Sequence, residues 1–212
     1  MVKQIKEKIN KKSRKLKILA ASDLHGESSL AKKLAERAEK ESVDLVVLCG
    51  DIMGWAETSN IIKPFKDKNQ KVLIIPGNHD SFATTDFLAK LYGVKNIHGY
   101  SVRYKNVGFF GAGGADLGIG TISESELFET LKKAHSYLQG IEKKIMVTHM
   151  HPSDSISEFS GISGSKAIKE AIKTFKPDIL LHGHIHEASG FEERIGKTKV
   201  INVGRDGKII EI

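Results

Sequence analysis

The sequence predicts an α/β fold, a sandwich in which mixed β-sheets are covered on the outside by helices. The first observation behind this prediction is a series of five apolar runs separated by helical patterns, because such runs are typical of buried parallel strands. The second is the presence of shorter apolar runs paired around tight turns, which indicate antiparallel strands. A chain of 212 residues without an evident linker fits one domain with a sizeable core.

The strands fall into two groups. The expected parallel strands are 16–21, 45–49, 72–76, 145–147 and 179–181. The expected antiparallel pairs are 100–105 with 107–111, and 191–195 with 199–203. A third hairpin is expected where the turn Arg205-Asp206-Gly207 joins Val203 to Ile209, because Asp-Gly is a frequent hairpin turn.

Five helices are expected between these strands. They span 29–41, 59–66, 85–92, 124–138 and 166–175. Pro64 disturbs the second helix, and Gly93 ends the third. Ser123-Glu124-Ser125-Glu126 is a capping box that starts the fourth, and Pro177 follows the end of the fifth.

The net charge of +7 is unevenly distributed. Residues 1–17 hold eight basic side chains and one acidic one, and the rest of the chain has equal numbers of the two. We therefore divide the chain into a basic N-terminal extension, 1–15, and a domain, 16–212. The extension is either a solvated tail or a segment that binds nucleic acid or an anionic membrane.

Composition also predicts the cellular setting. No apolar run approaches the roughly 18 residues of a membrane span, and the charged N-terminus does not resemble a signal peptide. The single cysteine, Cys49, cannot form an internal disulfide, which favours a reducing environment. We expect a cytoplasmic protein.

Polar segments with metal-ligand side chains follow all five predicted parallel strands. They are Asp23-Leu24-His25, Gly50-Asp51, Gly77-Asn78-His79-Asp80, Thr148-His149 and Gly183-His184-Ile185-His186. Because ligands bind beyond the carboxyl ends of such strands, we expect one polynuclear metal site. Carboxylate oxygens and imidazole nitrogens without thiolates suit Mn, Fe, Zn or Ni, and a set this rich in histidine suits Ca less well.

These five segments, in this order, resemble the motifs of the calcineurin-like metallophosphoesterases. The family pattern reads Asp-x-His, Gly-Asp, Gly-Asn-His-Asp, His and Gly-His-x-His, and the matching positions span residues 23–186. The chain looks most similar to the small prokaryotic and archaeal phosphoesterases that consist of this domain alone. The resemblance implies a four-layer αββα sandwich of two mixed sheets, like that of the metallo-dependent phosphatases.

The resemblance also implies a role for each motif residue. It assigns Asp23, His25 and His186 to a first metal, Asn78, His149 and His184 to a second, and Asp51 to a bridging position. The implied cofactors are two divalent ions, Mn first and Fe, Zn or Ni as alternatives. The implied reaction is hydrolysis of a small phosphodiester or phosphomonoester by a metal-bound hydroxide, without an enzyme nucleophile.

His79 is not a ligand in the family pattern. It resembles the histidine that protonates the leaving oxygen, and Asp80 would orient its imidazole.

His151 is an alternative to His149 as a ligand, or a substrate contact. Two features suggest substrate contacts without assigning them. Trp55 could stack on a base, although a packed loop aromatic is the better explanation. The helix start at 161–166 could bind an anion, although an ordinary helix start explains it at least as well.

The sequence departs from several branches of this superfamily. The protein serine/threonine phosphatases carry Gly-Asp-x-x-Asp-Arg-Gly, whereas residues 50–55 here contain no phosphate-binding arginine. Lipid A pathway hydrolases have arginine in the place of His79, and double-strand-break nucleases add a capping domain. The two alternatives that stay open are a nuclease or RNA-processing phosphodiesterase that uses the basic extension, and a non-catalytic metal-binding scaffold for protein interactions.

Overall fold

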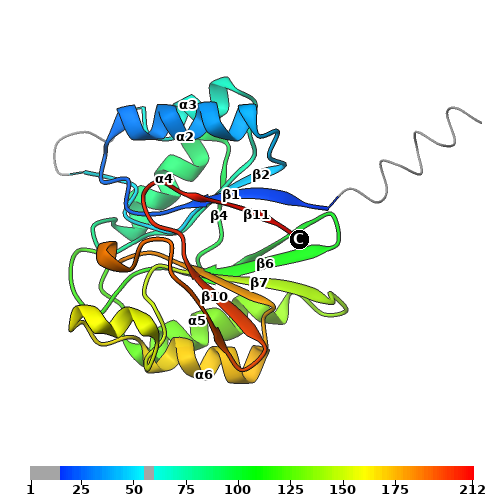
Figure 1. The fold of residues 1–212 in the computed structure, drawn as a ribbon. Coiled ribbons are helices and arrows are strands. Elements are labelled where there is room, and N and C mark those ends of the chain that lie inside the picture. Colours follow the sequence, from blue (N-terminus) through cyan, green and yellow to red (C-terminus); the bar gives the residue numbers. More distant parts are fainter. Residues whose placement is uncertain (1–14, 55–59) are drawn as a thin grey trace, which may run out of the picture.

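The computed structural model describes residues 15–54 and 60–212, which form two β-sheets packed face to face (Figure 1). The first sheet has the strand order β11-β1-β2-β3-β4. Its strands are β1 (Lys17–Ala21), β2 (Leu45–Leu48), β3 (Val72–Ile74), β4 (Lys95–Asn96) and β11 (Lys208–Glu211). The second sheet has the order β5-β6-β7-β8-β10-β9. Its strands are β5 (Ser101–Tyr104), β6 (Val107–Ala112), β7 (Lys143–Thr148), β8 (Ile179–His182), β9 (Glu192–Ile195) and β10 (Thr198–Asn202).

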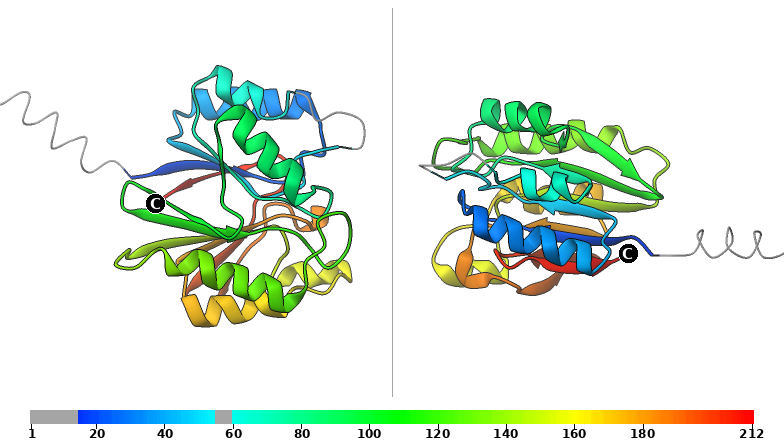
Figure 2. Two further views of the ribbon diagram at one scale, coloured as in Figure 1. Left: turned by 180° about the vertical axis from the view of Figure 1, so that it is seen from behind. Right: turned by 90° about the horizontal axis from the view of Figure 1, so that it is seen from above.

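Helices cover the outer face of each sheet, as the view from behind in Figure 2 also shows. Those on the first sheet are α2 (Ser28–Lys40), α3 (Lys63–Asp67) and α4 (Phe82–Tyr92). Those on the second are α5 (Glu124–Ser136) and α6 (Lys166–Phe175). Both sheets contain parallel and antiparallel neighbours, so the predicted four-layer sandwich of two mixed sheets is confirmed.

Three apolar layers hold the four structural layers together. In β2, Leu45 and Val47 point into the layer between the two sheets, whereas Val46 and Leu48 pack against the helices. Successive strand residues point to opposite faces, and here both faces are buried. This is why β2 and the other central strands read as continuous apolar runs in the sequence.

The parallel strands end at a common edge. Strands β1 to β4 are parallel to one another, as are β6, β7, β8 and β10. Their carboxyl ends lie on one side of the molecule, and the amino end of β1 lies on the opposite side with the C-terminus (Figure 1). The polar segments predicted to bind metal leave the strands at the carboxyl edge, whereas residues 1–14 of the predicted extension lie outside the described part of the chain.

The predicted hairpin around Asp206-Gly207 is wrong. Strand β10 already has a neighbour on each side, β8 and β9, so β11 has no free edge there. Instead β11 pairs antiparallel with β1, with Ile210 opposite Ile18. Residues 203–207 therefore carry the chain from the second sheet to the first, and Arg37 of α2 binds this connection by donating to the carbonyls of Asp206 and Gly207.

The helix predictions hold with shifted boundaries. The α4 helix begins three residues earlier than expected, at Phe82, because Ser81 caps it by accepting a hydrogen bond from the Thr84 N–H. Ser123 caps α5 as predicted. The predicted helix 59–66 begins with a residue outside the described ones, and the observed α3 starts at Lys63. The short strand β4 and two 3₁₀ helices, η1 (Ile156–Ser160) and η2 (His186–Ala188), were not predicted.

Within the described residues, no helix combines the length and the apolar character that crossing a membrane requires.

Replacing Phe109 by alanine tests the layer between the sheets. Its side chain is 0% exposed there, so Phe109→Ala should lower the free energy of unfolding by about 3–5 kcal/mol through lost burial and a residual cavity. Urea denaturation monitored by circular dichroism measures this change. In Phe87→Ala, which truncates a side chain that is 60% exposed, the change should stay within about 0.5 kcal/mol. Equal losses in the two variants would contradict this packing.

Candidate metal centre

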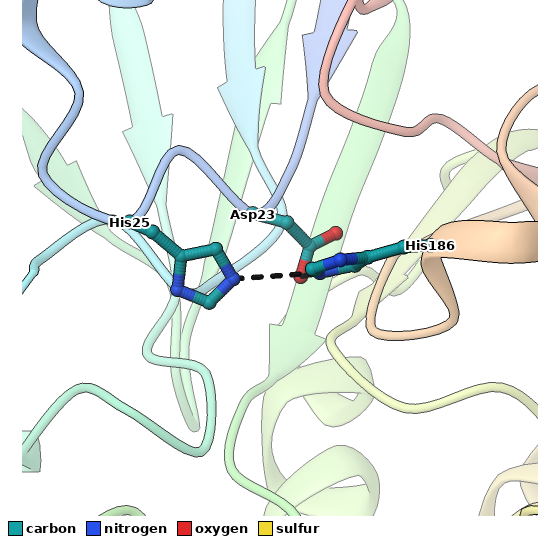
Figure 3. Close-up of side chains that lie close together, drawn as sticks. All are labelled: Asp23, His25 and His186. Carbon is teal, nitrogen blue, oxygen red and sulfur yellow. Dashed lines mark hydrogen bonds and ion pairs between the residues drawn. The ribbon is translucent and has the colours of Figure 1, made fainter.

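The first of two ligand clusters contains Asp23, His25 and His186 (Figure 3). One ligand atom from each lies within 4.8 Å of the others. The Nε2 atoms of the two histidines are 3.4 Å apart, and His186 Nε2 lies 3.7 Å from Asp23 Oδ1. Asp23 and His25 follow β1, and His186 begins η2 beyond β8, so the cluster joins the two sheets.

The second cluster is organised around the Asn78 amide. Its Oδ1 lies 2.9 Å from His149 Nε2 and 3.1 Å from His184 Nδ1. The other nitrogen of His149, Nδ1, donates to the carbonyl oxygen of Cys49 at 2.9 Å, which fixes the ring and turns Nε2 toward the centre. These three residues follow β3, β7 and β8.

Asp51 lies between the two clusters. Its Oδ2 is 3.4 Å from His149 Nε2 and 3.8 Å from His25 Nε2. It also groups with Asp23 and His149, with ligand atoms within 4.8 Å of one another. The structure thus brings all seven sequence-predicted ligands together, with Asp51 where a bridging carboxylate would have to be.

The donor set fits divalent cations. Carboxylate oxygens, an amide oxygen and imidazole nitrogens converge without a thiolate, which suits Mn, Fe, Zn or Ni. Burial lowers the pKa of His25, and it lowers the pKa of His184 to about 4. Both rings are therefore neutral at pH 7, the state in which an imidazole nitrogen can bind a metal.

Backbone strain accompanies the ligands. Four of them have φ in the left-handed region: Asp23 at 59°, His25 at 46°, Asp51 at 49° and His184 at 71°. Such residues are uncommon outside glycine and are concentrated at functional sites, where the surrounding structure offsets about 1–3 kcal/mol for each.

Close packing of the loops explains two of the motif glycines. A Cβ at Gly77 would lie 2.0 Å from Asp51 Oδ1, and one at Gly183 would lie 2.6 Å from Asp23 Oδ2. Any side chain at these positions would displace a candidate ligand. The motif glycines are thus required so that neighbouring ligand loops can touch.

Asp80 binds backbone N–H groups of two loops. Its Oδ1 accepts a hydrogen bond from the Met53 N–H, and its Oδ2 accepts from the N–H groups of Ile52 and Gly77. That Asp80 also orients the His79 imidazole stays a prediction. Asp80 ties the loop after β2 to the loop after β3, and so fixes the backbone on both sides of Asp51 and Asn78.

His79 lies at the open side of the centre. Its side chain is 38% exposed, and its Nε2 is 3.9 Å from Asp51 Oδ2. Its ring stands edge-on to His25 with centroids 5.0 Å apart, and its backbone N–H donates to Asp51 Oδ1. Its ligand atom also lies within 4.8 Å of those of His25 and Asp51, so the imidazole could contact an ion or a ligand bound there. Its catalytic role stays a prediction.

The remaining candidates take ordinary places. His151 is buried outside the two clusters, with Nε2 3.3 Å from the Ile162 carbonyl oxygen and no partner for Nδ1 among the described residues. The helix start at 161–166 is capped by Ser165, whose hydroxyl accepts from the Ile168 N–H, and the Glu124 carboxylate accepts from the Ala167 N–H. These two hydrogen bonds are those of an ordinary capped helix start. Trp55 lies outside the described residues.

Sequence reasoning missed one charged neighbour of the centre. Arg205 donates from Nε to the backbone carbonyl of Asp23 at 2.9 Å, and its Nη2 lies 2.6 Å from Glu27. It therefore braces the segment that carries Asp23 and His25. Its only sequence signal is its position before Asp-Gly, a position that predicts a hairpin turn rather than a contact with the centre.

Comparison with known proteins adds an independent result. A family model described as the calcineurin-like phosphoesterase superfamily domain matches residues 16–208. None of the curated proteins matches the chain.

Solved structures share the fold at low sequence identity. TT1561 of Thermus thermophilus superposes with a TM-score of 0.74 at 18% identity, over 93% of this chain and 99% of that one. A dimetal phosphatase from Danio rerio gives 0.65 at 12% identity, over 91% and 88%. A structure described as a novel archaeal phosphodiesterase gives 0.53 at 19% identity, over 92% and 99%.

The buried pair of Asp51 and His149 predicts how the stability of the metal-free protein depends on pH. Burial alone would lower the pKa of His149, but the hydrogen bond and charge of Asp51 outweigh it and raise this pKa to about 9. Burial likewise opposes ionisation of Asp51, yet His149 brings its pKa down to about 2. The hydrogen bond with Asp23 also raises the pKa of His186.

A histidine whose pKa is higher in the folded than in the unfolded protein stabilises the fold. The stabilisation is complete below the pKa of the unfolded state, near 6.5, and is lost as the pH rises through the pKa of the folded state. The stabilisation that His149 supplies to chelator-treated protein, measured as the free energy of unfolding of wild type minus that of His149→Gln, should therefore fall by about 1–3 kcal/mol between pH 6.5 and pH 9. Urea denaturation of both proteins at the two pH values measures it, and the difference cancels the opposite effect of the histidines whose pKa is lowered by burial, among them His182 and His184. A difference that stays constant with pH would contradict the assignment to this pair.

Proposed function

Because this chain belongs to the calcineurin-like phosphoesterase superfamily, we propose that it is a binuclear metal-dependent phosphoesterase acting on a phosphodiester or phosphomonoester. The observation that carries the proposal is the position of Asp51 between two clusters of candidate ligands. A single structural metal would need one cluster, whereas phosphoryl transfer uses a pair of ions about 3.5–4 Å apart.

Each cluster would hold one divalent ion. Asp23, His25 and His186 would bind the first, Asn78, His149 and His184 the second, and Asp51 both. Ions bound there would supply an activated water near pH 7 and would neutralise charge on the phosphoryl oxygens. Mn is the ion we propose, with Fe, Zn or Ni as alternatives of similar coordination.

The protein's own residues would do the rest. The loop contacts made by Asp80 and Arg205 hold the ligand backbone in place before substrate binds, so little reorganisation is needed during the reaction. The partly exposed His79 imidazole would donate a proton to the departing alcohol oxygen, and its position beside Asp51 supports this role.

Hydrolysis of paired chromogenic esters by Mn-reconstituted protein tests the proposal, and His79→Ala tests the role of the imidazole. We expect turnover of 4-nitrophenyl phosphate or its diester, and a loss of about 10²–10⁴ in kcat in His79→Ala with metal content unchanged. Metal analysis of both proteins is required alongside the rates. Asn96→Ala, which removes a half-buried side chain on β4 that donates to Asp86 and accepts from the His98 N–H, is the control and should keep full activity.

A protein that binds two ions and cleaves neither ester would contradict the enzyme proposal and favour the interaction scaffold. Turnover that is unchanged in His79→Ala would contradict the proposed role of this histidine alone.

Deleting residues 1–14 separates the nuclease alternative from hydrolysis of a small ester. The amino end of β1 lies at the edge opposite the candidate metal centre, so the deletion should leave kcat/KM for a small ester unchanged (Figure 1). Single-stranded DNA affinity at two salt concentrations should be measured in parallel, because each lost phosphate contact reduces the salt slope by about 0.7. A fall in small-ester turnover would contradict the expected independence of tail and centre.

A further inference from the structure

Three loops at the carboxyl edge expose large apolar side chains. Two of the loops follow β6 and β7, and the third precedes β9. Strands β6, β7, β8 and β10 are parallel, so their carboxyl ends share this edge, and β9 begins there because it is antiparallel to β10. The side chains are 43–75% exposed. We call them the apolar rim: Leu117, Ile119, Ile156, Phe159, Ile162 and Phe191. Exposed apolar groups gathered at one edge are typical of a binding surface.

The first of these loops touches the second ligand cluster. The Gly120 N–H donates to the Asn78 carbonyl at 3.0 Å, and a Cβ at Gly118 would lie 2.5 Å from the same oxygen. Leu117 and Ile119 flank this glycine. Two exposed apolar side chains therefore stand beside the backbone of a candidate ligand.

The other two loops contact residues close to the candidate ligands His184 and His186. His151 contacts the Ile162 carbonyl through Nε2, and its ring stacks with that of His184 at a centroid distance of 6.5 Å. Phe191 donates its N–H to the carbonyl of Ala188 in η2, the element that begins with His186. The Phe159 and Phe191 rings are 5.7 Å apart, so the two loops form a continuous surface.

The charge of these loops disfavours polyanionic ligands. Residues 113–123, 149–165 and 183–191 contain no lysine or arginine, although the chain has 33. They contain four carboxylates: Asp116, Asp154, Glu158 and Glu187. Binding a polynucleotide requires several cations against its phosphates, and an anionic membrane surface requires the same. Beyond Arg205, which is paired with Glu27, the three loops therefore suit a ligand whose one phosphoryl group lies at the metals and whose remainder is uncharged.

We infer that the substrate is a small phosphate ester with a single phosphoryl group and an apolar alkyl or aryl part, and that the apolar rim contacts this part. The inference rests on the proposed function, because the phosphoryl group must sit at the metal centre to place its substituent on the rim. The inferred substrate differs from a nucleic acid in one measurable way: its affinity should increase with the apolar area of its alkyl or aryl part.

A series of methyl, butyl and octyl 4-nitrophenyl phosphodiesters tests the inference with Mn-loaded, full-length protein. In each reaction water adds to phosphorus, the bond to the 4-nitrophenyl oxygen breaks, and alkyl phosphate and 4-nitrophenol are released. The leaving group is constant, so differences report binding of the alkyl chain. Burial of methylenes at a partly exposed rim should raise kcat/KM by about tenfold or more from methyl to octyl, mainly through KM. If the monoester is the preferred class, alkyl phosphates with phosphate detection form the equivalent series.

Rim variants assign the effect to these side chains. Leu117→Ser, alone and combined with Ile162→Ser, should flatten the dependence on chain length, because it removes apolar area beside the centre. The matched control is Leu91→Ser, in the last turn of α4, where the side chain is 58% exposed. This control should retain the full dependence, and thermal denaturation should show that all variants are folded.

The outcomes separate this inference from the proposed function. Turnover without dependence on chain length, or faster cleavage of a short oligonucleotide than of the octyl ester, would overturn the inference and leave the phosphoesterase proposal standing. A dependence that survives in the rim variants, or disappears in Leu91→Ser, would overturn its assignment to the rim. Absence of turnover for every ester would overturn the proposed function and the inference with it.

Discussion

The contact between the loops after β2 and β3 is the constraint on which the candidate metal centre depends. The buried Asp80 carboxylate accepts three backbone N–H groups, from Ile52, Met53 and Gly77, and so ties the two loops together. Gly77 then lies against Asp51 so closely that no side chain would fit between them. The carboxylate between the two clusters is therefore positioned by packing and backbone hydrogen bonds that exist before any ion binds.

Electrostatics explains why the centre needs a partner of positive charge. Asp23 and Asp51 are almost fully buried, a state that costs several kcal/mol for each unpaired carboxylate. Without an ion, the histidines supply the compensating charge, above all His149, whose pKa rises to about 9 beside Asp51. The chain thus holds protons where the proposed metals would bind, and uptake of the metals exchanges one kind of positive charge for another.

The sequence predicted what depends on local pattern and on the shared edge of parallel strands. Apolar runs identified β1, β2, β3, β7 and β8, and the polar residues after them are the candidate ligands that the structure brings together. It did not predict the partner of β11, because the Asp-Gly turn is equally compatible with a hairpin and with a crossing between sheets. The contacts of Asp80 and Arg205 were missed for a related reason. Both bind backbone groups of distant segments, and backbone groups leave no pattern in a sequence.

The pairing of β11 with β1 has a consequence for how the protein folds. Ile18 lies opposite Ile210, so the sheet that carries Asp23 is completed by residues almost 200 positions further along the chain. Arg205, which braces Asp23, arrives with the same late segment. Closing so long a loop has an entropic cost that no local contact offsets, and such high contact order is typical of slowly folding domains. The first ligand cluster therefore gains the brace of Arg205 only when this late segment of the chain has joined the first sheet.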